Sequence, residues 1–470
     1  MFTARTVART LSSVLLLANL LVPANAFATG VTFGPVTQVT PFPGFGYEPS
    51  MVVDGYGNIF ATAHKENWQL VLAPDTNSPT YTRSMSWDWV SVDGGLTFRD
   101  IPGLTAASIE QHQFGDEGDM ALDDAHHLYF VDTDVLDSSI TRWTVTGNSL
   151  SQIYLDFTRP LIPSLQPVDD RPWVTAHGNG HVFYLANEGN KTTYPLGQGQ
   201  GSGLGPGRYT VYQSYDGGIT FNSFGYTLND SGWCRPAADH SPNSAYVYAV
   251  CTNDKGTIYA YVSADDGRSF SRYQVGTYQA LDPTTSWPSV VVAPDASVWA
   301  LYVDAGVMQC NGSCNTPTTN VLNLFHSTDH GQTWTRSDIT PMVGRYRYAW
   351  LSMSFDGTKL GVGVYYTPDA TTMPWHVYGG IWSPGQKASL TSADPNNPVA
   401  TAGSEPSGDY MGSYFNPDST LGLIWTRRDI SVPGVASVAR IIYYARSQQQ
   451  NSDQDAGEGE DGDRDHFQFN

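Results

Sequence analysis

The fold is decided by the stretch Ser327-Thr328-Asp329-His330-Gly331-Gln332-Thr333-Trp334, because close copies of it occur at three other places in the chain. The other copies begin at Ser91, Ser214 and Ser263, and all share the pattern Ser-x-Asp-x-Gly-x-Thr/Ser-aromatic. In a tight hairpin an aspartate carboxylate accepts hydrogen bonds from backbone N–H groups, glycine allows a positive φ, and an aromatic residue packs beneath the turn. The pattern therefore predicts a repeated β-hairpin. The aspartates that would hold it are Asp93, Asp216, Asp265 and Asp329.

A second repeat lies between these hairpins: a polar or bulky residue leads into an apolar strand, a turn and an aromatic-rich strand. Its seven copies start at Glu48, Asp119, Arg171, Arg235, Trp287, Tyr348 and Asp409. The spacing of about 50–70 residues suits one four-stranded blade per copy. Apolar residues alternate, and glycine and proline together number 46 + 29 = 75, so helix is not expected. The sequence predicts an all-β, single β-propeller of four-stranded antiparallel blades, with seven blades favoured over six.

The four Ser-x-Asp-x-Gly copies resemble the Asp-box, or BNR, repeat of the sialidase-like β-propellers. In that superfamily the Asp box marks the fold and usually lies away from the active face, so the resemblance assigns these aspartates a structural role. The sialidase motif Arg-Ile-Pro is absent here, and Asp170-Arg171-Pro172-Trp173 stands in its place. The resemblance covers about residues 40–445, and its motifs specify the fold better than the function.

Three segments follow from composition. Residues 1–26 are typical of a secretory signal peptide, with Arg5 and Arg9 before an apolar run and Ala24-Asn25-Ala26 as cleavage site. Residues 27–446 form the expected propeller. Residues 447–470 carry seven acidic side chains against one arginine, which favours a disordered acidic tail. We therefore expect a secreted, extracellular protein with no membrane span.

The formal net charge of −21 makes nucleic acid an improbable partner. The tail accounts for 1 − 7 = −6 of that charge, so about −15 belongs to the rest of the chain. We expect a monomer that binds a glycan, and we expect no cofactor and no metal.

Secretion permits disulfides, and proximity favours the pairs Cys234–Cys251 and Cys310–Cys314 among three possible connectivities. Three sequons, at Asn190, Asn229 and Asn311, would be glycosylated only in a eukaryotic secretory pathway.

The first strand of each propeller blade lines the central axis, so residues that lead into these strands converge on one face. Three arginines there, Arg171, Arg235 and Arg347 (or Arg345 in place of Arg347), resemble the carboxylate-binding triad of sialidases. Guanidinium groups bind carboxylates bidentately and stay charged when half-buried. The alternative is that these arginines only pair with acidic neighbours across the channel.

Tyr410 beside Asp409 resembles the tyrosine nucleophile of sialidases. Glu48, Asp119 and Asp170 are the candidates for general acid or base. Histidines form a second set, because a uronate lyase needs a base near the sugar C5: His64, His112, His177, His240 and His376. The four tryptophans Trp173, Trp287, Trp299 and Trp350 lie within the strand repeats and are expected in the core.

These residues leave three hypotheses open. The first is a sialidase-like protein that recognises a carboxylated sugar, sialic acid or uronate, by glycoside hydrolysis or lyase chemistry. The second is a catalytically silent propeller that binds glycan or protein. The third is a propeller recruited for small-molecule chemistry.

Overall fold

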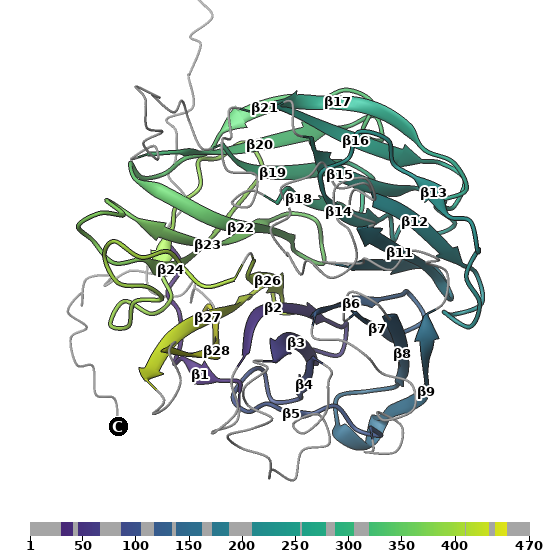
Figure 1. Ribbon diagram of the computed structural model, residues 1–470, viewed down its shortest axis with the longest axis horizontal. Coiled ribbons are helices and arrows are strands. Elements are labelled where there is room, and N and C mark those ends of the chain that lie inside the picture. The colour runs from purple at the N-terminus through teal and green to yellow at the C-terminus, as the bar shows by residue number, and fades with distance from the viewer. Residues whose placement is uncertain are drawn as a thin grey trace, which may run out of the picture.

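Seven four-stranded antiparallel sheets arranged around a central axis form a seven-bladed β-propeller (Figure 1). The computed structural model describes residues 30–40, 46–65, 86–104, 117–133, 138–161, 172–187, 209–253, 256–278, 287–304, 319–408, 410–431 and 438–448. The five strand starts predicted from the second repeat that fall within the described residues lie in or just before the first strand of a blade. The six-bladed alternative is excluded.

Blades 1 to 4 follow one another along the chain, each running from an inner to an outer strand. Blade 1 contains β2 (Gly46–Val53), β3 (Ile59–Lys65), β4 (Trp87–Ser91) and β5 (Arg99–Asp100). Blade 2 contains β6 (Glu117–Leu122), β7 (His127–Thr133), β8 (Ser138–Val145) and β9 (Ile153–Leu161), with the 3₁₀ turn η1 (Leu150–Gln152). Blade 3 contains β10 (Trp173–His177), β11 (His181–Asn187), β12 (Tyr209–Ser214) and β13 (Tyr226–Thr227). Blade 4 contains β14 (Trp233–Ala238), β15 (Val247–Thr252), β16 (Thr257–Ser263) and β17 (Ser271–Thr277).

Blades 5 and 6 repeat this order, and blade 7 takes its outermost strand from the N-terminal part of the chain. Blade 5 contains β18 (Ser289–Val292), β19 (Val298–Asp304), β20 (Val321–Ser327) and β21 (Thr335–Asp338). Blade 6 contains β22 (Arg345–Met353), β23 (Leu360–Thr367), β24 (His376–Trp382) and β25 (Thr391–Ser392). Blade 7 contains β26 (Gly412–Phe415), β27 (Leu421–Ser431), β28 (Val438–Arg446) and β1 (Thr37–Gln38).

The hydrophobic core lies between neighbouring blades. In β7, Leu128 and Phe130 point to the cluster shared with blade 1, whereas Tyr129 and Val131 point to the cluster shared with blade 3. Because side chains alternate along a strand, a strand between two blades must be apolar on both faces. The outer strand β21 is exposed throughout and reads Thr-Arg-Ser-Asp. This layering explains why the second strand of each repeat is rich in aromatic residues.

The four Asp-box hairpins join the third and fourth strands of blades 1, 3, 4 and 5. In blade 5, Asp329 accepts hydrogen bonds from Thr333 N (2.8 Å) and Thr333 Oγ1 (2.6 Å). Ser327 Oγ donates to Asp329 and accepts from Gly331 N, both at 2.8 Å. The same contacts recur around Asp93, Asp216 and Asp265. The Ser, Asp, Gly and Thr/Ser positions of the pattern each take part in one of these hydrogen bonds, which explains the residue types found there.

Two consecutive residues of each box have positive φ. The second is always glycine: Gly95, Gly218, Gly267 and Gly331, with φ between 74° and 91°. The first is Gly94 or Gly217 in two boxes, but Asp266 and His330, both at φ 57°, in the others. This turn contacts the preceding blade, since a Cβ on Gly267 would lie 2.8 Å from the Phe183 ring. Glycine is therefore required at the second position for both conformation and space.

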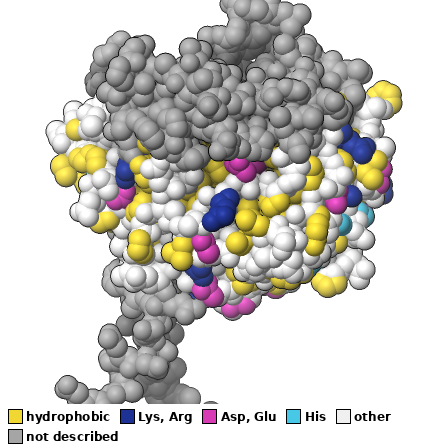
Figure 2. All heavy atoms as spheres, turned by 90° about the horizontal axis from the view of Figure 1, so that it is seen from below, with side chains coloured by type: hydrophobic (Ala, Val, Ile, Leu, Met, Phe, Trp, Pro, Cys, Tyr) yellow, Lys and Arg dark blue, Asp and Glu magenta, His cyan; other side chains and the backbone are white. Residues whose placement is uncertain are grey.

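Cys234 and Cys251 form a disulfide between β14 and β15, where they lie directly opposite each other. This is the pairing predicted from proximity; Cys310 and Cys314 lie outside the described residues. No helical segment in the described part of the chain has the length and apolar character of a membrane span. On the face seen from below, basic side chains lie close to acidic ones, and neither sign forms a continuous patch (Figure 2).

Candidate functional site

The inner strands contact one another in a closed ring from β2 to β26, and their first residues meet at one end of the axis. This end gathers Glu48 from β2, Glu117 from β6, Arg235 from β14, Arg347 from β22, and Tyr410 just before β26. Each of these five side chains is buried. In a chain with only 15% charged residues, such a concentration of buried charge marks the candidate site.

Two of the inner strands are bulged where they enter the site. The register of β2 on β3 shifts between Tyr47 and Ser50, and that of β22 on β23 shifts between Arg347 and Trp350. Glu48 and Tyr348 lie within these bulges with φ of 54° and 55°. A positive φ is unfavourable for residues with a Cβ, and a bulge re-aims the side chains beside it. Regular strand pairing is therefore interrupted at the point where Glu48 is directed toward the axis.

Glu48, His64, Glu117 and Tyr410 form one polar cluster. His64 Nε2 lies 3.1 Å from Glu48 Oε2 and 3.5 Å from Glu117 Oε1. The Tyr410 hydroxyl donates to Glu117 Oε1 at 3.4 Å. Both carboxylates and the imidazole between them are buried. The cluster thus links a phenol, a carboxylate and an imidazole in one chain of contacts.

Tyr410 is a neutral phenol in this environment. Burial, followed by the negative charges of Glu117 and Glu48, raises the pKa of Tyr410 well above its usual value, and Arg235 opposes the shift only in part. The hydroxyl therefore does not ionise by itself at neutral pH. To act as a nucleophile it must lose its proton to a base as the new bond forms, and Glu117 is positioned to accept that proton.

Arg235 lies inside a cage of aromatic rings. Its guanidinium carbon is 3.1 Å from the ring centroid of Trp173, 3.9 Å from that of Trp350 and 5.0 Å from that of Tyr410. Burial lowers the pKa of Arg235 to about 9, and the Asp119 carboxylate opposes the shift, so the group stays protonated at neutral pH. Among the described residues its Nη2 atom has no hydrogen-bond partner. This is a buried cation with a free donor.

Asp119 binds the inner strands to one another. Its carboxylate accepts from Ser50 Oγ of β2 (2.7 Å) and from Val174 N of β10 (3.1 Å). Burial raises the pKa of Asp119, while Arg235 acts in the opposite direction. With both oxygens engaged, this side chain holds three blades in register beside the site.

The third arginine of the predicted triad, Arg347, shares the acidic partner Glu405 with Arg345. Arg345 Nη1 lies 3.3 Å from Glu405 Oε1, and Arg347 Nη1 lies 2.5 Å from Glu405 Oε2. Glu405 is half-exposed, whereas both arginines have little exposed surface. Part of the positive charge predicted for carboxylate binding is therefore paired within the protein.

The structure thus brings Glu48, Asp119, Arg235, Arg347 and Tyr410 to the same end of the axis. Asp170, Arg171 and Asp409 lie outside the described residues, as do Asn190, Asn311 and His112. Asn229 is exposed. The other histidines of the second set lie elsewhere: His240 contacts Asp124 at 2.6 Å, and His376 contacts the Asp394 carbonyl at 3.2 Å.

Sequence reasoning did not single out Glu117 as the partner of Tyr410. The two residues lie 293 positions apart, and only closure of the ring joins them. A usable signal existed, since Glu117 leads into a strand repeat in the same way as Glu48. The tryptophans were expected in the core, and Trp173 and Trp287 are buried there, but Trp173 and half-buried Trp350 also enclose the Arg235 guanidinium.

Two groups among the described residues offer three ligand atoms within 4.8 Å of one another: Glu48–His64–Glu117 at the axis, and His177–His181–Asp266 between blades 3 and 4. The axial group consists of residues of the polar cluster described above. The second group contains no residue of that cluster.

Three comparisons with known proteins gave the following similarities. Residues 325–336 match the BNR/Asp-box repeat model. No curated protein sequence matches the chain. A protein of unknown function from Dyadobacter fermentans is 14% identical, with a TM-score of 0.48, covering 90% of this chain and 100% of that one. NanB sialidase from Streptococcus pneumoniae is 11% identical, with a TM-score of 0.43 over 88% of this chain and 70% of that one. The intramolecular trans-sialidase from Ruminococcus gnavus is 12% identical, with a TM-score of 0.39 over 86% and 94%.

The protein is thus a seven-bladed β-propeller with Asp-box hairpins and a buried, charged site at one end of its axis.

Proposed function

We propose that this protein is a secreted carbohydrate-active enzyme that binds a carboxylated sugar, sialic acid or a uronate, at the axial site and hydrolyses its glycosidic bond. The observation that carries the proposal is the contact of the Tyr410 hydroxyl with Glu117 beside the Arg235 guanidinium. It combines a nucleophile, a base for its proton and a buried cation with a free donor. The disulfide between Cys234 and Cys251 is compatible with an oxidising, extracellular compartment.

In this mechanism the Tyr410 oxygen attacks the anomeric carbon while its proton passes to Glu117. The bond from that carbon to the leaving oxygen breaks, and an acid protonates the oxygen. Glu48, whose Oε2 atom lies 3.1 Å from His64 Nε2, is the described candidate for that acid. Water then attacks the anomeric carbon and gives a proton to the Glu48 carboxylate. The bond from that carbon to the Tyr410 oxygen breaks, the sugar is released, and the phenol recovers its proton from Glu117.

A neutral nucleophile is an advantage for a substrate that carries its own carboxylate. An aspartate or glutamate would repel that charge at close range, whereas the raised pKa keeps Tyr410 uncharged. Arg235 offers the opposite charge, and its Nη2 atom is a donor to which a carboxylate oxygen would bind. Arg347 would contribute only if substrate displaced Glu405 from it.

The test is turnover of sialylated and uronate-bearing oligosaccharides by the purified protein, followed as release of free sugar. Tyr410→Phe and Glu117→Gln should each lower kcat/KM by about 10²–10⁴-fold, because they remove the nucleophile and its base. Tyr154→Phe is the matched control, since Tyr154 is exposed on the outer strand β9 and should leave turnover unchanged. Wild-type protein that cleaves none of these glycans would contradict the proposal.

A second candidate is elimination from a uronate, and the placement of His64 favours it. His64 lies in the same cluster as Tyr410 and Glu117, so an imidazole base and a phenol acid are available at one site. A lyase would produce an unsaturated sugar with ultraviolet absorbance, which hydrolysis does not. In that case His64→Gln should abolish the absorbing product.

A binding protein without catalysis is a third candidate, and the pairing of Arg345 and Arg347 with Glu405 favours it. Retention of a glycan without turnover, weakened in Arg235→Lys but not in Tyr410→Phe, is the result expected for a protein of this class.

A further inference from the structure

His177 and His181 lie at the end of the ring opposite to the axial site. They are the last residue of β10 and the first residue of β11, and they pair directly across the hairpin. Trp173, at the other end of β10, belongs to the Arg235 cage. The Asp-box turn of blade 4 reaches this hairpin, because Asp266 Oδ1 lies 3.2 Å from His177 Nε2 and 3.3 Å from His181 Nδ1. Side chains of two blades thus meet at one carboxylate oxygen.

These distances suit a tetrahedral metal ion. Zn²⁺ binds imidazole nitrogen and carboxylate oxygen at about 2.0–2.2 Å, which separates neighbouring ligand atoms in a tetrahedron by about 3.3–3.5 Å. The three ligand atoms lie within 4.8 Å of one another, so a small adjustment would place each at bonding distance from a common centre. Two histidines and an aspartate with one open position form a ligand set that Zn²⁺ accepts.

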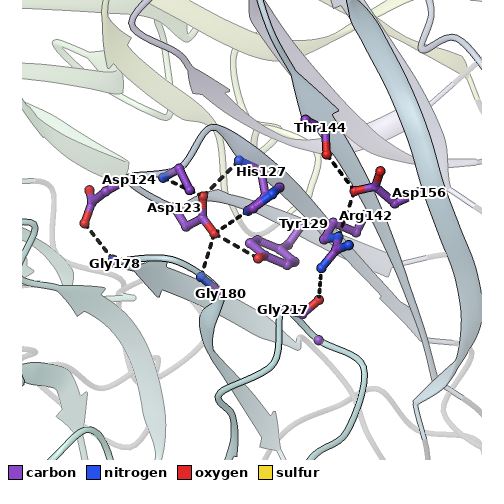
Figure 3. Close-up of polar contacts among 12 residues, drawn as sticks. Asp123, Asp124, His127, Tyr129, Arg142, Thr144, Asp156, Gly178, Gly180 and Gly217 are labelled. Atoms are coloured by element: carbon purple, nitrogen blue, oxygen red, sulfur yellow. Dashed lines mark hydrogen bonds and ion pairs between the residues drawn. The ribbon is translucent and has the colours of Figure 1, made fainter.

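The two imidazoles are held in place by blade 2. The turn between them, Gly178 to Gly180, donates Gly178 N to Asp124 Oδ2 (2.6 Å) and Gly180 N to Asp123 Oδ2 (2.9 Å). Figure 3 shows both aspartates pointing at this turn. The His177 ring also stacks on Phe183, with centroids 5.5 Å apart. Outer contacts that fix the backbone and rings of ligands are what a metal site needs.

His177 provides the independent indication of a ligand. Its side chain is 3% exposed, and among the described residues its Nε2 atom has no hydrogen-bond partner, although it points at Asp266. A buried polar atom in that state requires an explanation.

The residue at position 266 is also unusual for its place in the box. Two of the other boxes carry glycine there, Gly94 and Gly217, which adopts the positive φ at no steric cost. Blade 4 instead carries a carboxylate, aimed at the preceding blade. Arg268 Nη1 lies 3.7 Å from Asp266 Oδ2 and donates to the Asp265 carbonyl at 2.8 Å, while its side chain is mostly exposed.

We propose that His177, His181 and Asp266 form a Zn²⁺ site that joins blades 3 and 4, with water as the fourth ligand. The site lies away from the axial residues and is independent of the proposed hydrolysis. Its occupant would act as a cross-link between blades, so the ion stabilises the folded ring by mass action.

The test uses full-length protein treated with EDTA and then titrated with ZnSO₄ by calorimetry, with Tm measured in parallel. Wild-type protein should bind one equivalent, and its Tm should rise with Zn²⁺ concentration. Asp266→Gly restores the residue found in two other boxes and should fold, yet it should weaken Zn²⁺ binding by at least about tenfold and abolish the Tm rise. His181→Gln, at the half-exposed ligand, should behave in the same way.

The matched control is His330→Gly, which makes the same kind of change at the same box position in blade 5 and should leave Zn²⁺ binding intact. Cobalt provides a second readout, because Co²⁺ in a tetrahedral site absorbs visible light and Asp266→Gly should remove that absorbance. The proposal is overturned if EDTA-treated wild type binds no Zn²⁺. It is equally overturned if binding persists in Asp266→Gly and is lost only in His64→Gln, which would place the ion at the axis.

Discussion

At the scale of single residues, the half-buried carboxylate of Asp329 organises a whole turn. It accepts from Thr333 Oγ1, Thr333 N, Ser327 Oγ and Gln332 N. Hydrogen bonds from the Thr333 hydroxyl and N–H lower the pKa of Asp329 to about 2. A carboxylate with a lowered pKa in the folded state contributes stability above its unfolded pKa near 3.8, and that stability disappears as the pH falls toward 2.

Asp329→Asn should lower the free energy of unfolding by about 1–2 kcal/mol at pH 6, because hydrogen bonds to a charged acceptor are replaced by bonds to a neutral one. The difference from wild type should shrink as the pH falls from 4 to 2. Urea unfolding across this pH range measures both effects. Asp338→Asn is the control, since Asp338 accepts one backbone N–H at the end of an outer strand. An equal deficit at pH 2 and pH 6 would show that charge is not the cause.

The contacts of a residue could be predicted from the sequence where its partners lie only a few positions away. The partners of Asp329 lie within four positions, so the pattern itself describes the turn. Tyr410 was singled out by resemblance, but its described carboxylate partner, Glu117, is 293 positions away. The left-handed backbone of Glu48 and Tyr348 has no signal in residue type, because neither is glycine or asparagine. Sequence patterns therefore indicated which residues reach the axis and not which of them touch.

At the scale of elements, the disulfide between β14 and β15 fixes the hairpin that carries Arg235, the residue after Cys234. The cysteines are separated by 17 positions, and closing a loop of that size restricts the unfolded chain by about 3 kcal/mol. The double variant Cys234→Ala/Cys251→Ala should lose about that much free energy of unfolding in urea.

Single and double variants distinguish the disulfide from packing. Cys234→Ala alone already breaks the bond, so it should lose nearly as much stability as the double variant. Deficits that simply add from the two single variants would mean that each sulfur contributes only its own packing in the core between blades 3 and 4.

The strand order within blades 1 to 6 was predictable because neighbouring strands are neighbours in sequence, whereas the pairing of β1 with β28 in blade 7 was not. The bulges in β2 and β22 could not be predicted from the sequence, since a bulge is a property of the pairing between strands. Their place beside Glu48 and Arg347 shows that the departures from regular pairing coincide with the site, which is where a fold is expected to depart from its local rules.

At the scale of the whole molecule, the ring closes through the N-terminal segment, which pairs with β28 of the last blade. Gly34 N donates to Arg446 O (2.9 Å), Val39 N donates to Ile442 O (2.8 Å), and Ile442 N donates to Thr40 Oγ1 (2.9 Å). Phe33 packs against the core of blades 6 and 7. At the axis, β26 of the last blade contacts β2 of the first, and Tyr410 reaches Glu117 in the second. We expect this contact to depend on the closure of the ring by β1.

Deleting residues 1–40 should therefore lower the free energy of unfolding by at least about 3 kcal/mol, because hydrogen bonds of about 1 kcal/mol each and the packing of Phe33 are lost. The unpaired edge of β28 should also promote association, visible as higher mass in light scattering. A deletion of residues 1–29 keeps the whole pairing segment and serves as the control, with unchanged Tm. If the longer deletion unfolds at the same urea concentration as the shorter one, β26, β27 and β28 close the ring without β1, and the Tyr410–Glu117 contact does not rest on the N-terminal strand.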